Sequence, residues 1–190
     1  MISWVFAVGR MVGFGTAAGV RASLTLVTIG ILSRLEWGAH VSPRFMWLHS
    51  WVAIMLFILL TIFEATFDKV PSLDRLQDTL IMPYRIVVGA LAGAATIHHG
   101  WTGFAIGMVV GAAAGWFGQS VKHGIRPRST ASGLTVALIS MMEDMFAFVG
   151  AAFTAVFSLV GYGVFAANLW LFSRLARRRR AKYKGLRVLR

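Results

Sequence analysis

Four of the seven acidic residues in this chain lie within fifteen positions, directly after an uncharged apolar run. They are Glu64, Asp68, Asp74 and Asp78, and the run WVAIMLFILLTIF precedes them at residues 51–63. Because Glu64 and Asp68 are four residues apart, both carboxylates can share one face of a helix. Ionisable groups at or inside a bilayer are costly and usually mark a polar pathway. We therefore predict that Glu64 binds an ion or a substrate, and that Asp68 extends its site.

The same stretch has a simpler interpretation, in which nearby cations neutralise the carboxylates. Lys69, Arg75 and Arg85 are close in sequence to the acidic residues. Pro71 prevents the two acidic pairs from lying on one continuous helix. In this interpretation the stretch is an ion-paired connection at the membrane surface, and the sequence leaves both interpretations open.

Arg21 and the acidic pair Glu143–Asp144 are further charges in apolar surroundings. A charge removed from water must be paired, so Arg21 requires a carboxylate partner. The candidates are Glu64, Asp68, Glu143 and Asp144. We predict that these four carboxylates and Arg21 together form an ion- or substrate-binding site.

A donor-rich connection follows at residues 121–133 and indicates a second, anion-binding site. Its candidate ligands are His123, Arg126, Arg128, Ser129 and Thr130. Guanidinium and hydroxyl groups are the donors that proteins use to hold phosphate and other oxyanions. The sequence leaves open whether the chain binds a metal.

The overall composition indicates that these side chains belong to a membrane protein. The chain is 57% hydrophobic and 14% charged, whereas a typical soluble domain is about 25% charged. Uncharged runs of roughly 18–20 residues recur, the length that crosses a hydrocarbon core. We predict an all-α, polytopic bundle of transmembrane helices. Since the chain has no cysteine, disulfides and thiolate metal sites are excluded.

Proline positions divide the apolar sequence into candidate membrane segments, because proline disfavours a helix interior. Each of the four prolines is interpreted as a connection between such segments. The predicted segments are residues 2–33, 46–63, 84–99, 101–121 and 131–172. We expect interrupted helices: the first segment is interrupted by Arg10, by the glycines of GFGTAAG and by Arg21, and the last has a break at Glu143 and Asp144. This gives five or six spans.

The last residues of the chain form a basic tail. We divide the chain into a transmembrane domain at residues 1–173 and a cytoplasmic tail at residues 174–190. The tail carries nine of the nineteen lysines and arginines and no acid. The positive-inside rule places such a tail in the cytoplasm, where anionic lipid headgroups are its expected partner. We expect no binding to nucleic acid.

Glycines recur at intervals of four residues, most clearly at Gly107, Gly111 and Gly115. This spacing puts small residues on one helix face, where a second backbone can approach closely. Packing within the chain is the main interpretation, and a homo-oligomer is the alternative. The segments GTAAG at 15–19 and GAAAG at 111–115 also suggest a weak internal repeat, a device that transporters use to build a site.

Five short segments occur in an order that resembles domain-of-unknown-function family 4126, a group of small bacterial membrane proteins. The segments are GVRASL (19–24), E-x-x-x-DKVPSLD-x-x-x-D (64–78), R-x-x-x-GAL (85–91), H-x-x-x-x-RST (123–130) and S-x-x-ED (140–144). The resemblance implies that Arg21, the acidic stretch, the Arg-Ser-Thr turn and Glu143–Asp144 belong to one shared pattern, but it brings no activity. We expect a multi-pass protein of the bacterial inner membrane.

Three functions fit these observations. The first is a transporter or channel-like permease, in which Glu64 or Glu143 binds a proton or cation and Arg21 balances the charge. The second is a membrane scaffold or assembly protein, in which all charges form internal ion pairs. The third is a lipid-linked phosphate hydrolase, loosely similar to undecaprenyl-pyrophosphate phosphatases, with Mg²⁺ held by Glu64 and Asp68. No complete catalytic motif is present, so an enzyme is less favoured and no cofactor is expected.

Overall fold

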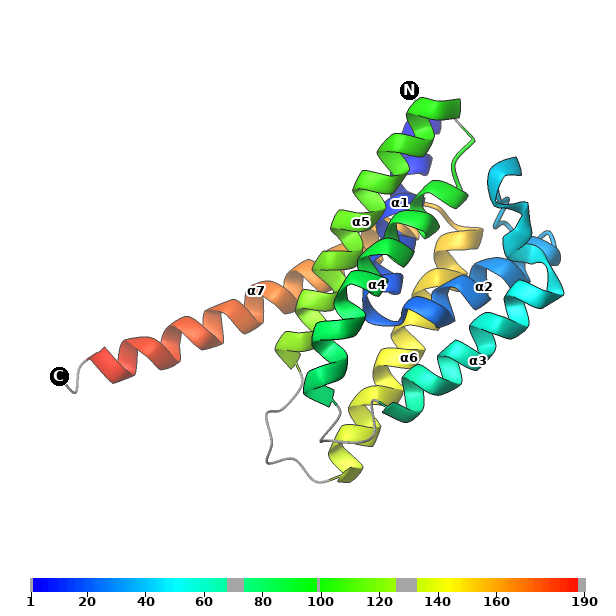
Figure 1. Cartoon of the computed structure of the whole chain (residues 1–190). Coiled ribbons are helices and arrows are strands. Elements are labelled where there is room, and N and C mark those ends of the chain that lie inside the picture. The colour runs from blue at the N-terminus through cyan, green and yellow to red at the C-terminus, as the bar shows by residue number, and fades with distance from the viewer. Residues whose placement is uncertain (1, 68–73, 99, 126–132, 188–190) are drawn as a thin grey trace.

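Figure 1 shows the computed structural model of the protein, which describes residues 2–67, 74–98, 100–125 and 133–187. Within these residues every regular element is a helix, as the hydropathy pattern predicted. The elements are α1 (Ile2–Val20), α2 (Ala22–Arg34), the 3₁₀ helix η1 (Pro43–His49), α3 (Trp51–Phe67), α4 (Asp74–Ala95), α5 (Gly100–Ile125), α6 (Gly133–Val156) and α7 (Val160–Arg187).

Two helices in the described part of the chain are long and apolar enough to cross a membrane. They are Gly100–Gly124 in α5 and Ala137–Val156 in α6. A third span results if η1 and α3, which meet at a bend of 63°, are counted together. The apolar parts of α2 and α4 are shorter than a span. The helices therefore indicate a membrane protein, but they do not confirm the predicted five or six spans.

Glycine determines how closely α1, α4 and α5 pack at the centre of the bundle. A Cβ atom added at Gly111 of α5 would lie 2.3 Å from the carbonyl oxygen of Gly89 in α4. A Cβ atom at Gly19 of α1 would lie 2.1 Å from the carbonyl oxygen of Gly115. The predicted close packing within the chain is thus confirmed. The two G-x-A-A-G segments also lie against one another, since Gly15 faces Gly111 as Gly19 faces Gly115.

The first apolar segment breaks at Arg21 as predicted, but the interruptions predicted at Arg10 and at the glycines of GFGTAAG are wrong. Arg21 has an extended backbone, with φ −143° and ψ 96°, and stands between α1 and α2. Arg10 and the glycines of residues 13–19 remain inside α1. In Figure 1, α2 leaves the end of α1 in a new direction. The break therefore places charged Arg21, the carboxyl-terminal end of α1 and the amino-terminal end of α2 inside the bundle.

Two further predicted interruptions are wrong. Helix α6 runs unbroken through Glu143 and Asp144, and the helix ends at Val156 instead. Charged side chains do not interrupt a helix when partners on other helices neutralise them, as described below. Helix α4 likewise continues through Pro83. Proline removes only one N–H donor, and beyond Pro83 the helix packs closely against α5 at Gly89 and Gly93.

The last helix joins the apolar and basic parts of the chain. Helix α7 extends from Val160 to Arg187, so residue 173 is not a helix boundary. In Figure 1 the carboxyl-terminal part of α7 projects away from the other helices. The basic tail consequently begins on a continuous helix rather than after a loop.

Candidate functional site

The break between α1 and α2 places the guanidinium of Arg21 inside the protein. Arg21 is only 1% exposed. Its Nε pairs with Oδ1 of Asp144, and its terminal nitrogen donates to Oγ of Ser140 at 2.6 Å. Ser140 and Asp144 are one turn apart on α6, so both can face the break. Arg21 therefore has the carboxylate partner that its apolar surroundings required.

A second buried ion pair joins α3 and α4. Arg85 of α4 is fully buried, and Glu64 of α3 is 4% exposed. The Nε and one terminal nitrogen of Arg85 donate to Oε1 of Glu64, at 3.1 and 2.7 Å. The other terminal nitrogen donates to Oε1 of Gln119 on α5. Several charge-assisted hydrogen bonds from one planar group fix its orientation, so Arg85 links three helices rigidly.

A third cation, Lys122 of α5, lies at the end of α1. Its Nζ is 3.3 Å from the carbonyl oxygen of Val20 and 3.2 Å from Oε2 of Glu143. Val20 is the last residue of α1, and the final carbonyls of a helix have no partner within that helix. The negative end of the helix dipole also favours a cation there. Lys122 thus stabilises the helix end that the break exposes.

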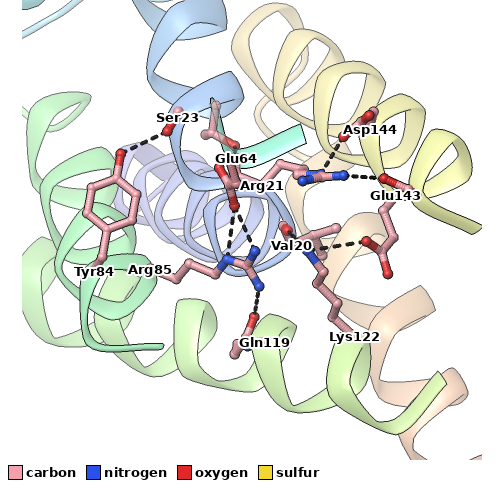
Figure 2. Close-up of polar contacts among 12 residues, drawn as sticks. Val20, Arg21, Ser23, Glu64, Tyr84, Arg85, Gln119, Lys122, Glu143 and Asp144 are labelled. Atoms are coloured by element: carbon pink, nitrogen blue, oxygen red, sulfur yellow. Dashed lines mark hydrogen bonds and ion pairs between the residues drawn. The ribbon is translucent and has the colours of Figure 1, made fainter. Parts of the chain in front are cut away.

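Figure 2 shows that these pairs form one group, which we call the buried charge network. Its charged members are Arg21, Glu64, Arg85, Lys122, Glu143 and Asp144. Among the side chains that the structure describes, three cations face three carboxylates, so the formal charge of these six groups is zero. Buried ions are tolerated when their charges and hydrogen bonds are matched in this way. The side chain of Asp144 is 36% exposed, so the network reaches the surface along α6.

A cavity of about 270 Å³ adjoins the network between α5, α6 and α7. Its polar lining consists of Lys122, Glu143 and Asn168 of α7, and apolar side chains such as Val121 and Phe146 form most of the rest. Asn168 is 2% exposed. This arrangement can hold a few waters or a small molecule beside the Lys122–Glu143 pair.

The structure brings together four of the predicted site residues, Arg21, Glu64, Glu143 and Asp144. Asp68 lies outside the described residues, as do four predicted anion ligands: Arg126, Arg128, Ser129 and Thr130. His123 is exposed near the end of α5, next in sequence to Lys122. Among the described residues, no group of histidines and carboxylates has the arrangement of a metal site.

Three members of the site were not predicted as site residues. The sequence indicates Arg85 only as a counter-charge for the acidic stretch and Lys122 only as part of the donor-rich connection at residues 121–133. It gives Gln119 no role. One signal was available: Gln119 and Lys122 are three residues apart near the end of an apolar run, and this spacing puts both on one helix face.

Beside Arg85, a hydrogen bond between Tyr84 and Ser23 ties α4 to α2. The two hydroxyl oxygens are 2.9 Å apart. We expect Tyr84→Phe to lower the free energy of unfolding by about 0.5–1.5 kcal/mol, because a partly buried hydroxyl loses its partner. Chemical unfolding of the wild type and of Tyr84→Phe in detergent measures the difference in free energy. Tyr162→Phe is the matched control, since the Tyr162 hydroxyl donates to the Val5 carbonyl at an exposed site. Equal losses in both variants would contradict the expectation.

Comparison with protein families matches residues 8–178 to the family described as domain of unknown function DUF4126. The matched region contains every member of the buried charge network. Comparisons with curated proteins and with solved structures gave no match. The family match and the apolar helices together indicate a membrane protein of unknown function. Since the match covers most of its length, the chain belongs to the domain-of-unknown-function 4126 family.

Proposed function

We propose that the protein is a small membrane permease, and that an ion or small solute passes at the break between α1 and α2. One observation supports this most strongly: an extended residue, Arg21, joins two helices at a point where buried charges from α3, α4, α5 and α6 converge. Many transporters bind their cargo at interrupted helices, whose ends offer backbone groups to it. Ionisable residues within membrane helices commonly mark such a pathway.

The described arrangement is the closed state in this proposal. Each cation is held by a carboxylate, and Arg21, Arg85 and Lys122 are at most 2% exposed. Glu143 is the carboxylate of the network that lines the cavity, so it is the one that meets a proton or cation entering there. Its neutralisation would release Lys122 and the end of α1. A ligand that binds this released form more tightly shifts the population toward it.

We further propose five or six spans, with the carboxyl terminus in the cytoplasm of a cell with an inner membrane. Helix α1 has 19 residues, which at 1.5 Å per residue reach about 28 Å, close to the thickness of a hydrocarbon core. Nine basic residues follow Ser173. Their charge favours the cytoplasmic side and contact with anionic headgroups.

Flux through liposomes containing the purified protein tests the permease function. Wild type is compared with Glu64→Gln for H⁺, Na⁺, K⁺, Cl⁻ and phosphate. We expect flux of at least one of them, and a fall to below about a tenth of that rate in Glu64→Gln, because Arg85 loses its counter-charge inside the pathway. Glu36→Gln is the matched control, since Glu36 is exposed in a turn outside the network.

A folded wild-type protein that conducts none of these ions would contradict the permease function. A membrane scaffold is the second candidate, because each described cation of the network pairs with a carboxylate. Absence of flux, together with a loss of stability in Glu64→Gln, would support the scaffold. Phosphate release from a lipid-linked pyrophosphate without any flux would instead support the hydrolase. Gel filtration of each variant shows whether the bundle is folded.

A further inference from the structure

A second cavity, of about 350 Å³, lies at the end of the bundle where α1 begins. One face of α1 lines it, formed by Ser3, Phe6, Ala7 and Arg10 at the spacing of successive helical turns. Arg10 precedes Arg21 by eleven residues on the same chain segment, which corresponds to about 16 Å along a helix. The cavity is therefore separate from the buried charge network and from the cavity beside Lys122.

Arg10 is half-buried in this cavity and is held in place by two neutral acceptors. Its Nε donates to Oγ of Ser158 at 2.8 Å, and a terminal nitrogen donates to the carbonyl oxygen of Gly38 at 3.1 Å. A Cβ atom at Gly9 would lie only 2.3 Å from the carbonyl oxygen of Ser158. The close contact of α1 with the segment before α7 thus positions Ser158 against the guanidinium.

No carboxylate whose side chain the structure describes pairs with Arg10. Glu64, Glu143 and Asp144 belong to the buried charge network. Among the carboxylates whose side chains the structure describes, this leaves Glu36, which is exposed and forms no ion pair with Arg10. A guanidinium has more N–H donors than the two bonds above employ. Its charge and its remaining donors are consequently available to an anion that enters the cavity.

We propose that this cavity binds an oxyanion, a phosphate or carboxylate group, and that Arg10 is the residue that recognises it. The planar guanidinium matches two oxygens of such a group. Ser3 and His98, which also line the cavity, are exposed and add polar groups at its mouth. Phe6, Ala7 and Ile97 give the cavity an apolar side, so the oxyanion belongs either to a small solute or to a lipid headgroup. This site does not depend on the permease function.

Binding of inorganic phosphate and of phosphatidylglycerol to the full chain tests the proposal. Phosphate is titrated calorimetrically into the detergent-solubilised protein at low salt, and lipid binding is followed by native mass spectrometry. Arg10→Gln is expected to weaken binding by about tenfold or more, because charge-assisted hydrogen bonds are lost. Arg44→Gln is the matched control. Arg44 is exposed, and its guanidinium carbon Cζ lies 3.8 Å from the centroid of the Trp101 ring.

If phosphate binds to the wild type and Arg10→Gln weakens that binding, the ligand is a free oxyanion. If only phosphatidylglycerol binds and Arg10→Gln weakens that binding, the ligand is a lipid headgroup. Binding that is equal in wild type and Arg10→Gln, as expected if only the basic tail binds, would overturn the proposal, as would no binding at all. If Arg10→Gln does not fold, Ser3→Trp obstructs the exposed mouth instead, and undiminished binding in that variant overturns it.

Discussion

Arg85→Met is expected to lower the free energy of unfolding by about 3–5 kcal/mol, because it removes the buried guanidinium that pairs with the carboxylate of Glu64. Two nitrogens of Arg85 donate to Oε1 of Glu64. Gln119 loses its guanidinium partner in the same step. Methionine replaces the aliphatic stem, so the change acts mainly on charge and hydrogen bonding. Equilibrium unfolding in detergent, monitored by circular dichroism, measures the loss.

Two further variants separate charge from packing at this site. The double variant Glu64→Gln with Arg85→Met should recover part of the lost stability, because the remaining partner no longer carries a buried charge. Arg44→Met removes an exposed arginine from a tryptophan face and should cost about 0.5–1 kcal/mol. If Arg85→Met costs no more than Arg44→Met, the Glu64–Arg85 pair does not hold α3 against α4.

Gly111→Ala is expected to destabilise the protein by about 1–3 kcal/mol through overpacking between α4 and α5. The new Cβ atom would lie 2.3 Å from the carbonyl oxygen of Gly89. That oxygen belongs to the backbone, so the two helices must separate to admit the methyl group. The same unfolding experiment measures the effect.

Gly163→Ala provides the matched control for this substitution. Gly163 is also in a helix, and nothing lies within 4 Å of a Cβ atom added there. Alanine should be neutral at this position or stabilise α7 by up to about 1 kcal/mol, since glycine weakens a helix interior. A neutral result at Gly111 would show that the α4–α5 contact is looser than the structure describes.

The sequence predicted the parts of this structure that depend on local composition. Hydropathy indicated an all-helical membrane protein, and the four-residue glycine spacing indicated close helix contacts such as that of Gly111 with Gly89. The charge of Arg21 in an apolar segment was sufficient to predict a carboxylate partner, and Asp144 is that partner. In each case the requirement, whether burial of apolar residues, close packing at glycine or a partner for a buried charge, follows from the type of residue and does not depend on which helices pack together.

The parts that the sequence did not predict depend on which helices pack together. Lys122 pairs with Glu143 across two helices, and no spacing along the chain reveals that pair. Arg85 was expected to neutralise carboxylates of the acidic stretch, and it pairs with Glu64, but the sequence did not indicate which carboxylate it would contact. The break expected at Glu143 failed for the same reason: its charge is matched by a lysine on α5, and α6 needs no interruption. Pro83 shows that tertiary packing can retain a helix through an unfavourable residue.

The most direct test of the permease site is the chemical accessibility of a cysteine placed at Ser140, beside Arg21. Because the natural chain has no cysteine, a single introduced thiol reports without background. Ser140 and Ala92 are 2% and 0% exposed, and Ala92 lies in the apolar core. We expect a small charged methanethiosulfonate reagent to modify Ser140→Cys in liposomes through transient opening of the network, and to leave Ala92→Cys unmodified. A folded Ser140→Cys that reacts no faster than Ala92→Cys would contradict a permease site at Arg21 and identify the network as a sealed structural core.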